Sequence, residues 1–139
     1  MLGRLRTARE PDRADTGKWG EAQAARFLKR TGYRILGTRV RVKPRGELDL
    51  VARDGQILVF VEVKTRHSED FGRPISAVDR NKRRALCRAA VRYLERLRYP
   101  RICFRFDVVE VVGGPGEPDP VVRHVQNAFQ LDRRYQLPI

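Results

Sequence analysis

Two carboxylates and one amine interrupt an apolar stretch of the sequence at spacings that suit chemistry. Asp49 lies in one predicted strand, while Glu62 and Lys64 lie two residues apart on one face of the next. Buried charges are costly unless they pair with one another or bind a metal. Carboxylate oxygens suit a hard cation such as Mg²⁺, and a neighbouring lysine can hold a water or help to deprotonate it. The alternative is a structural ion pair with one carboxylate left over.

The dipeptide Asp54-Gly55 sets the expected register between these two strands. It suits a two-residue hairpin turn between strands at residues 47–53 and 56–65. Pairing across that turn places Asp49 between the levels of Phe60 and Glu62. Glu47 shares the face of Asp49 and is expected at the rim.

Each of two predicted helices carries one charged residue at the start of an apolar stripe. Glu21 shares a face with Ala25 and Leu28, and Lys82 shares a face with Leu86. Helix starts near a sheet end are common sites, so Glu21 is expected near a metal or its waters, and Lys82 near a phosphate. The alternatives are a first-turn carboxylate favoured by the helix dipole and a solvated amine.

The remaining elements follow from periodicity and turn residues. Residues 1–14 are expected to form a mobile basic arm, and residues 15–139 a single domain, with Asp15 and Thr16 as helix-capping candidates. An antiparallel meander followed by a helical crossover predicts an α/β fold with a mixed sheet. Helices are expected at residues 19–30 and 79–98. Strands are expected at residues 33–42, in the hairpin at 47–53 and 56–65, at 101–112, and, as an extra strand, at 121–126. Loops are expected at residues 67–75 and 113–120.

Charge points to a polyanionic partner. The 139 residues include 30 Lys plus Arg against 17 Asp plus Glu, a net charge of +13. Residues 1–45 carry +9 and 76–112 carry +6, whereas 46–75 carry −2. Such a field attracts phosphate backbones. The alternative is a coding preference, because 25 of the 30 basic residues are Arg.

Membrane and secreted classes are not expected. The longest apolar run, residues 57–61, is far shorter than the roughly 20 residues of a membrane helix, and the first residues lack a signal-peptide apolar stretch. Cys87 and Cys103 are expected to be buried small side chains in a reducing cytoplasm, and His67 and His124 have no partner at metal-ligand spacing.

Five segments together resemble the YraN-like family of small uncharacterised bacterial proteins. The resemblance covers nearly everything after residue 15 and is carried by residues 17–21, 46–50, 61–66, 105–108 and 124–129. That family is similar to archaeal Holliday-junction resolvases and to the PD-(D/E)XK nuclease superfamily. Arg45 stands where relatives tend to have a second glycine, and Thr38 where they often have Asn, which affects the expected loop geometry.

The resemblance implies a restriction-endonuclease-like fold, a mixed β-sheet flanked by helices, and metal-dependent phosphodiester cleavage. Asp49 matches the first acid of the superfamily pattern, Glu62 and Lys64 match its acid-x-lysine, and Glu21 matches the glutamate that resolvases add. Asp49, Glu62 and the Val63 carbonyl would hold Mg²⁺ or Mn²⁺. A homodimer is also implied.

The expected function is therefore that of an endonuclease acting on branched nucleic acid, with DNA favoured over RNA. The residues expected to hold the phosphate backbone are Arg66, Lys82, Arg84 and Arg88. Two alternatives remain open: a catalytically silent nucleic-acid-binding adaptor of the same fold, and a protein-binding module whose basic faces meet an acidic partner.

Overall fold

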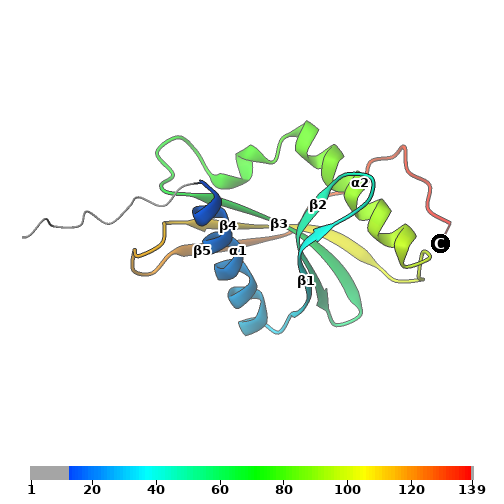
Figure 1. Cartoon of the computed structure of the whole chain (residues 1–139), viewed down its shortest axis with the longest axis horizontal. Coiled ribbons are helices and arrows are strands. Elements are labelled where there is room, and N and C mark those ends of the chain that lie inside the picture. Colours follow the sequence, from blue (N-terminus) through cyan, green and yellow to red (C-terminus); the bar gives the residue numbers. More distant parts are fainter. Residues whose placement is uncertain (1–12, 139) are drawn as a thin grey trace, which may run out of the picture.

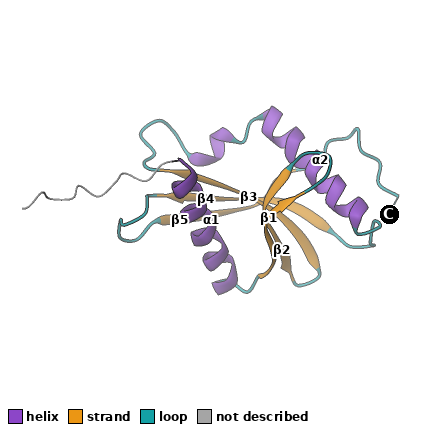
Figure 2. Cartoon of the chain, in the orientation of Figure 1, coloured by secondary structure: helices purple, strands orange, loops and turns teal. Residues whose placement is uncertain are grey.

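The computed structural model describes residues 13–138, which form a mixed sheet with helices on both faces (Figure 1). Figure 2 shows the same chain by secondary structure. In chain order the elements are α1 (Arg13–Arg30), β1 (Arg34–Arg41), β2 (Glu47–Asp54), β3 (Ile57–Arg66), the short 3₁₀ helix η1 (Pro74–Ala77), α2 (Arg80–Arg96), β4 (Phe104–Val112) and β5 (Val121–Phe129).

The five strands lie side by side in chain order, β1-β2-β3-β4-β5. Only β3 and β4 are parallel, and they are joined through α2. The other neighbours are antiparallel. A parallel pair needs a long crossover, and here the second helix supplies it. The predicted mixed α/β fold, including the extra C-terminal strand, is confirmed.

The strand β3 is covered on both faces because its side chains alternate between two apolar clusters. Phe60 belongs to the cluster that contains Leu86 and Leu94 of α2. Val61 belongs to the cluster that contains Leu28 of α1. Burying both faces explains why β3 reads as a nearly continuous apolar run. In that setting, a charged residue on β3 faces a helix rather than open solvent.

Helix boundaries differ from the sequence prediction mainly at α1. The helix begins at Arg13, so Asp15 and Thr16 lie within its first turn rather than capping a helix at residue 19. The predicted arm, residues 1–14, lies outside the described residues except for its last two, which belong to α1. Gly17 and Gly20 are poor helix formers, so the sequence favoured a later start. By contrast, Asp79 caps α2 as its side chain accepts from the Lys82 N–H at 2.9 Å.

The hairpin register was predicted wrongly by two residues. The turn residues are Gly55 and Gln56, and Asp54 pairs with Ile57. Gly55 has φ 58°, which suits the first position of a two-residue turn that favours glycine there. Moving the turn one residue along shifts the pairing, so that the ladder ends at Leu50 opposite Val61.

Two smaller observations complete the fold. Cys87 is buried as expected, but Cys103 is exposed because it precedes β4 rather than lying within it. Within residues 13–138, neither helix is long and apolar enough to span a bilayer.

Candidate active site

Two carboxylates meet where the β2–β3 ladder ends. Asp49 and Glu62 are the next residues beyond the last pair, Leu50 and Val61, so they lie opposite one another. The Asp49 carboxylate accepts the Val63 N–H at 2.9 Å, which replaces a ladder hydrogen bond with a side-chain one. Their closeness follows directly from the corrected turn.

The surroundings of this carboxylate pair disfavour two full negative charges. Glu62 is only 3% exposed, and its Oε2 is buried with no hydrogen-bond partner. Burial and the charge of Glu62 raise the pKa of Asp49 to about 7, although the Val63 N–H opposes that rise. Two nearby carboxylates resist ionising together unless a proton or a cation lies between them. A proton held between the two carboxyl groups, or a bound cation, relieves this repulsion.

Two lysines approach the other oxygen of Glu62. The Lys64 ammonium lies 3.2 Å from Glu62 Oε1, and the Lys82 ammonium lies 3.3 Å from the same atom. Lys64 comes from the same strand, whereas Lys82 comes from the first turn of α2. Lys82 thus joins the carboxylate site itself, and both amines leave Oε2 available.

Glu21 does not join this group. Its carboxylate accepts from Arg39 Nε at 2.8 Å and lines a separate open pocket of about 430 Å³ with Lys18 and Thr38. Its charge is a minor contribution to the raised pKa of Asp49. Within residues 13–138, no three His, Cys, Asp or Glu side chains gather as a metal-ligand group. Glu21 therefore lies beside the carboxylate pair without completing it.

The packing of α1 on β3 sets the position of Glu21. Gly20 is buried against Thr65, and a Cβ at Gly20 would lie 1.9 Å from Thr65 Oγ1. Only a residue without a side chain allows this approach. The glycine before Glu21 thus brings the start of α1 down to the same end of β3 as Lys64.

A divalent cation fits the donors that are present. Mg²⁺ is commonly held by one or two carboxylates together with water and substrate oxygens. Asp49 and Glu62 offer two carboxylates, one with a buried oxygen that lacks a partner. The N–H and C=O of a strand residue point to the same neighbour. The Val63 carbonyl therefore faces the side on which its N–H meets Asp49.

The three arginines predicted to bind phosphate do not converge on the carboxylates. Arg66 turns onto the following loop, where its guanidinium contacts the Phe71 carbonyl at 3.3 Å and Ser76 Oγ at 3.5 Å. Arg84 and Arg88 lie exposed on the outer face of α2. They form part of a row with one arginine per four residues: Arg80, Arg84, Arg88, Arg92 and Arg96.

Comparison with known proteins identifies the family. A family model described as "Uncharacterised protein family UPF0102" matches residues 20–111. A UPF0102 protein of Symbiobacterium thermophilum is 50% identical over 113 residues, covering 81% of this chain and 94% of that protein. One from Nocardia farcinica is 43% identical over 122 residues, covering 88% of this chain and 94% of that protein. The chain belongs to the UPF0102 family.

This confirms the YraN-like resemblance seen in the sequence. The UPF0102 match spans the two carboxylates and both lysines of the site, along with α2 and nearly all of β4. The family description assigns no activity. The geometry of this UPF0102 chain therefore has to support any function on its own terms.

Sequence reasoning missed two buried carboxylates in β4. Asp107 and Glu110 are both fully buried. Asp107 accepts from Arg105 Nε at 2.9 Å, from the Asn127 N–H at 2.9 Å and lies 2.7 Å from His124 Nε2. The signal was present, because Asp107 interrupts an apolar strand as Glu62 does. Only the partners show that Asp107 serves structure.

Glu110 holds the loop that follows β3. It accepts from the Arg73 guanidinium, from the Ile75 N–H at 2.9 Å and from Arg123 Nε at 3.1 Å. Together with the Arg66 contacts, these bonds fix the segment between β3 and α2. Because Lys82 follows that segment, Glu110 helps to set where Lys82 enters the site.

Proposed function

We propose that this chain is a divalent-metal-dependent endonuclease that hydrolyses phosphodiester bonds in nucleic acid, with branched DNA as the preferred substrate. The observation that carries the proposal is the buried Glu62, whose Oε2 lacks a partner beside Asp49 while two lysines meet Oε1. The ion pairs with the two lysines use Oε1 alone, whereas a cation between Asp49 and Glu62 would use Oε2 as well. A site for a cation and a phosphate uses every group.

Each residue has a task in such a reaction. Asp49, Glu62 and the Val63 carbonyl would hold Mg²⁺ or Mn²⁺. When bound, the cation supplies Lewis-acid polarisation of the scissile phosphate and offsets negative charge. Lys64 positions the attacking water through its ammonium group. Lys82 meets the negative charge that develops on the phosphate oxygens. Glu21 orients water from the neighbouring pocket.

The charge distribution supports a nucleic-acid substrate. Residues 76–112 carry +6, and Arg84 and Arg88 lie exposed on the outer face of the helix that supplies Lys82. Contacts from such arginines to phosphates position a duplex without reading its sequence. Base-specific recognition is not part of the proposal.

Branched substrates and a homodimer belong to the same proposal. Resolving a four-way junction symmetrically requires two sites related by a twofold axis, which a homodimer supplies. Sedimentation with and without junction DNA measures this. A stoichiometry of two chains per junction supports a branched substrate. A stoichiometry of one chain per junction contradicts symmetric resolution by a homodimer.

The decisive experiment is a cleavage assay on labelled four-way junction, flap, single-stranded and duplex DNA, and RNA, with Mg²⁺ or Mn²⁺. Wild type is compared with Asp49→Asn and Lys64→Ala. Asp70→Asn is the matched control, because Asp70 is exposed on the loop after β3. Cleavage by wild type and the control alone supports the nuclease. If wild type binds the nucleic acids but cuts none of them, the nuclease proposal is wrong and a catalytically silent adaptor is favoured.

A further inference from the structure

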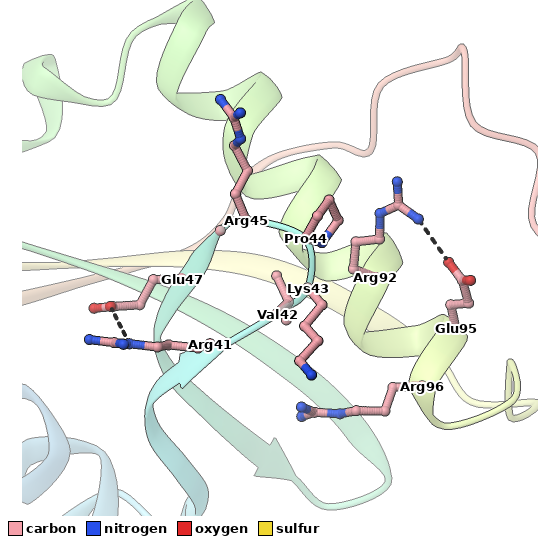
Figure 3. Close-up of a pocket in the computed structure, with 10 residues that line it drawn as sticks. Arg41, Val42, Lys43, Pro44, Arg45, Glu47, Arg92, Glu95 and Arg96 are labelled. Atoms are coloured by element: carbon pink, nitrogen blue, oxygen red, sulfur yellow. Dashed lines mark hydrogen bonds and ion pairs between the residues drawn. The ribbon is translucent and has the colours of Figure 1, made fainter.

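A basic pocket of about 1040 Å³ lies away from the carboxylates, between the β1–β2 turn and the last turns of α2 (Figure 3). Its turn side carries Arg41, Lys43 and Arg45, and its helix side carries Arg92 and Arg96. In Figure 3 the Lys43 and Arg96 side chains, one from each side, extend into the same space. Two segments distant in sequence thus assemble one cationic concavity.

The positive charge of this pocket is not balanced by its own carboxylates. Glu47 already pairs with Arg41 at 4.0 Å, and Glu95 with Arg92 at 3.4 Å. Lys43, Arg45 and Arg96 have no carboxylate within ion-pair distance among the described residues.

Lys43 and Arg96 extend into one space, where their like charges repel, and the Arg96 guanidinium also lies over the Tyr93 ring at 5.1 Å from its centroid. Arg45 extends from the turn away from these two side chains (Figure 3). The dipole of α2 accounts for Arg96 near the helix end, but it accounts for neither residue of the turn. A polyanion relieves this repulsion more than scattered surface counterions do.

The pocket faces the same side of α2 as the catalytic end. Lys82, Ala89 and Arg96 follow one another at intervals of seven residues, which stay nearly in line on a helix. The turn crosses the helix between them, since a Cβ on Gly46 would lie 3.4 Å from the Ala89 Cβ. Arg96 is therefore about 21 Å along α2 from Lys82.

The near wall of the pocket lies closer to the carboxylates. Glu47 lines the pocket and precedes Asp49 by two residues of β2, or about 7 Å. The pocket thus begins roughly 7 Å from Asp49 along β2 and ends about 21 Å from Lys82 along α2. Phosphates of one duplex strand recur about every 3.4 Å along the axis, so these two distances correspond to about two and six base pairs.

We infer that this pocket binds backbone phosphates of a duplex arm whose adjoining segment lies at the carboxylate pair. The inference rests on the proposed function, and it names where the arm of the substrate leaves the site. The ligand chemistry is the internal phosphodiester group. The pocket adds affinity and direction to the arm, while cleavage takes place at Asp49 and Glu62.

The test compares two variants that each lose three positive charges. The pocket variant is Lys43→Gln/Arg45→Gln/Arg96→Gln. The control is Arg26→Gln/Lys29→Gln/Arg34→Gln, which changes exposed residues of α1 and the start of β1. Circular dichroism and thermal unfolding verify that both fold like wild type. Equal net charge separates a local contact from a general loss of attraction.

Binding is measured without divalent metal, on a duplex of about 20 base pairs, over a series of salt concentrations. Each lost phosphate contact lowers the log-log salt slope by about 0.9. For the pocket variant, the slope of log affinity against log salt concentration is expected to fall by about two to three, and the affinity to fall at least tenfold. Both losses are expected to be much smaller for the control variant. Equal losses in both variants, or no loss in the pocket variant, overturn the inference.

The same duplex with and without 5′-phosphates separates internal from terminal phosphate. An effect of the pocket variant on both duplexes supports the inference, whereas an effect confined to the 5′-phosphorylated duplex overturns it. Because no metal is present, the result is independent of cleavage. If the pocket variant binds more weakly than wild type but wild type cuts no substrate, the proposed nuclease activity is wrong and the pocket inference stands. If wild type cuts its substrate but the pocket variant binds as tightly as wild type, the pocket inference is wrong and the proposed nuclease activity stands.

Discussion

Glu62 on β3 and Asp107 on β4 are buried carboxylates on adjacent parallel strands, and their surroundings treat them in opposite ways. Asp107 has hydrogen-bond partners on both oxygens. Glu62 has one oxygen with no partner and lies beside Asp49. Burial alone therefore does not mark a chemical site. The difference between Glu62 and Asp107 lies in how many of their hydrogen bonds the chain supplies.

The pKa values express the same contrast. Burial raises the pKa of Asp49 to about 7, with the charge of Glu62 adding to the rise. Burial also acts on Asp107, but hydrogen bonds with His124, Arg105 and the Asn127 N–H outweigh it and lower the pKa of that carboxyl. One carboxyl group resists ionisation in its surroundings, and the other is stabilised as a carboxylate by the chain itself.

The largest expected effect separates activity from stability at Glu62. Glu62→Gln removes one charge from the pair and is expected to lower cleavage by at least about 100-fold. The free energy of unfolding should change by less than about 1 kcal/mol, because the change relieves repulsion with Asp49 and both lysines can reach water. Cleavage kinetics and urea unfolding measure the two effects. Glu117→Gln, an exposed glutamate on the loop before β5, is the control.

The opposite result is expected on β4. Asp107→Ala leaves Arg105 and His124 without their shared carboxylate, and breaking such a buried pair costs about 3–5 kcal/mol. Urea unfolding measures the loss, with Asp70→Ala expected within about 0.5 kcal/mol of wild type. If Asp107→Ala lowered the free energy of unfolding only slightly and Glu62→Gln lowered it strongly, the contrast between the two carboxylates would be wrong.

A pH series sharpens the same contrast. Burial opposes the lowered pKa of Glu110, but bonds from Arg73, Ile75 and Arg123 dominate, and Asp107 is lowered in the same direction. Groups with a depressed folded pKa stabilise the fold above their unfolded values, here 3.8 and 4.5, and lose that contribution as pH falls below them. Wild type should therefore lose stability from about pH 5 downward. Asp107→Asn should show a shallower loss, and an equal slope would contradict the assignment.

The smallest effect is expected at Glu21. Its partner Arg39 is exposed, and solvent screens such a pair, so the pair contributes little to stability. Glu21→Gln should leave the urea midpoint almost unchanged and lower cleavage by less than about tenfold, because Glu21 lies outside the carboxylate pair. A loss as large as that of Glu62→Gln would make Glu21 a third ligand and turn the pair into a triad.

Much of the architecture could be predicted, because local patterns control it. The strands, both helices and the parallel crossover follow from periodicity and turn residues. The register did not follow, because Asp54-Gly55 and Gly55-Gln56 are both acceptable two-residue turns. The two registers differ by two residues and leave every side chain on the same face, so the alternation of apolar residues cannot distinguish them. Glu62 and Lys64 could be predicted as site residues because the alternation of side chains puts both charges on one face of an otherwise apolar strand.

Composition, periodicity and turn residues were enough to predict the mixed fold, the positive charge and the candidate residues Asp49, Glu62 and Lys64. The tertiary structure decided that Lys82 meets Glu62, that Glu21 pairs with Arg39, and that Asp107 is satisfied while Glu62 is not. The reason is physical: side-chain alternation is local, whereas the partners of a buried charge come from strands and helices that meet only when the chain folds.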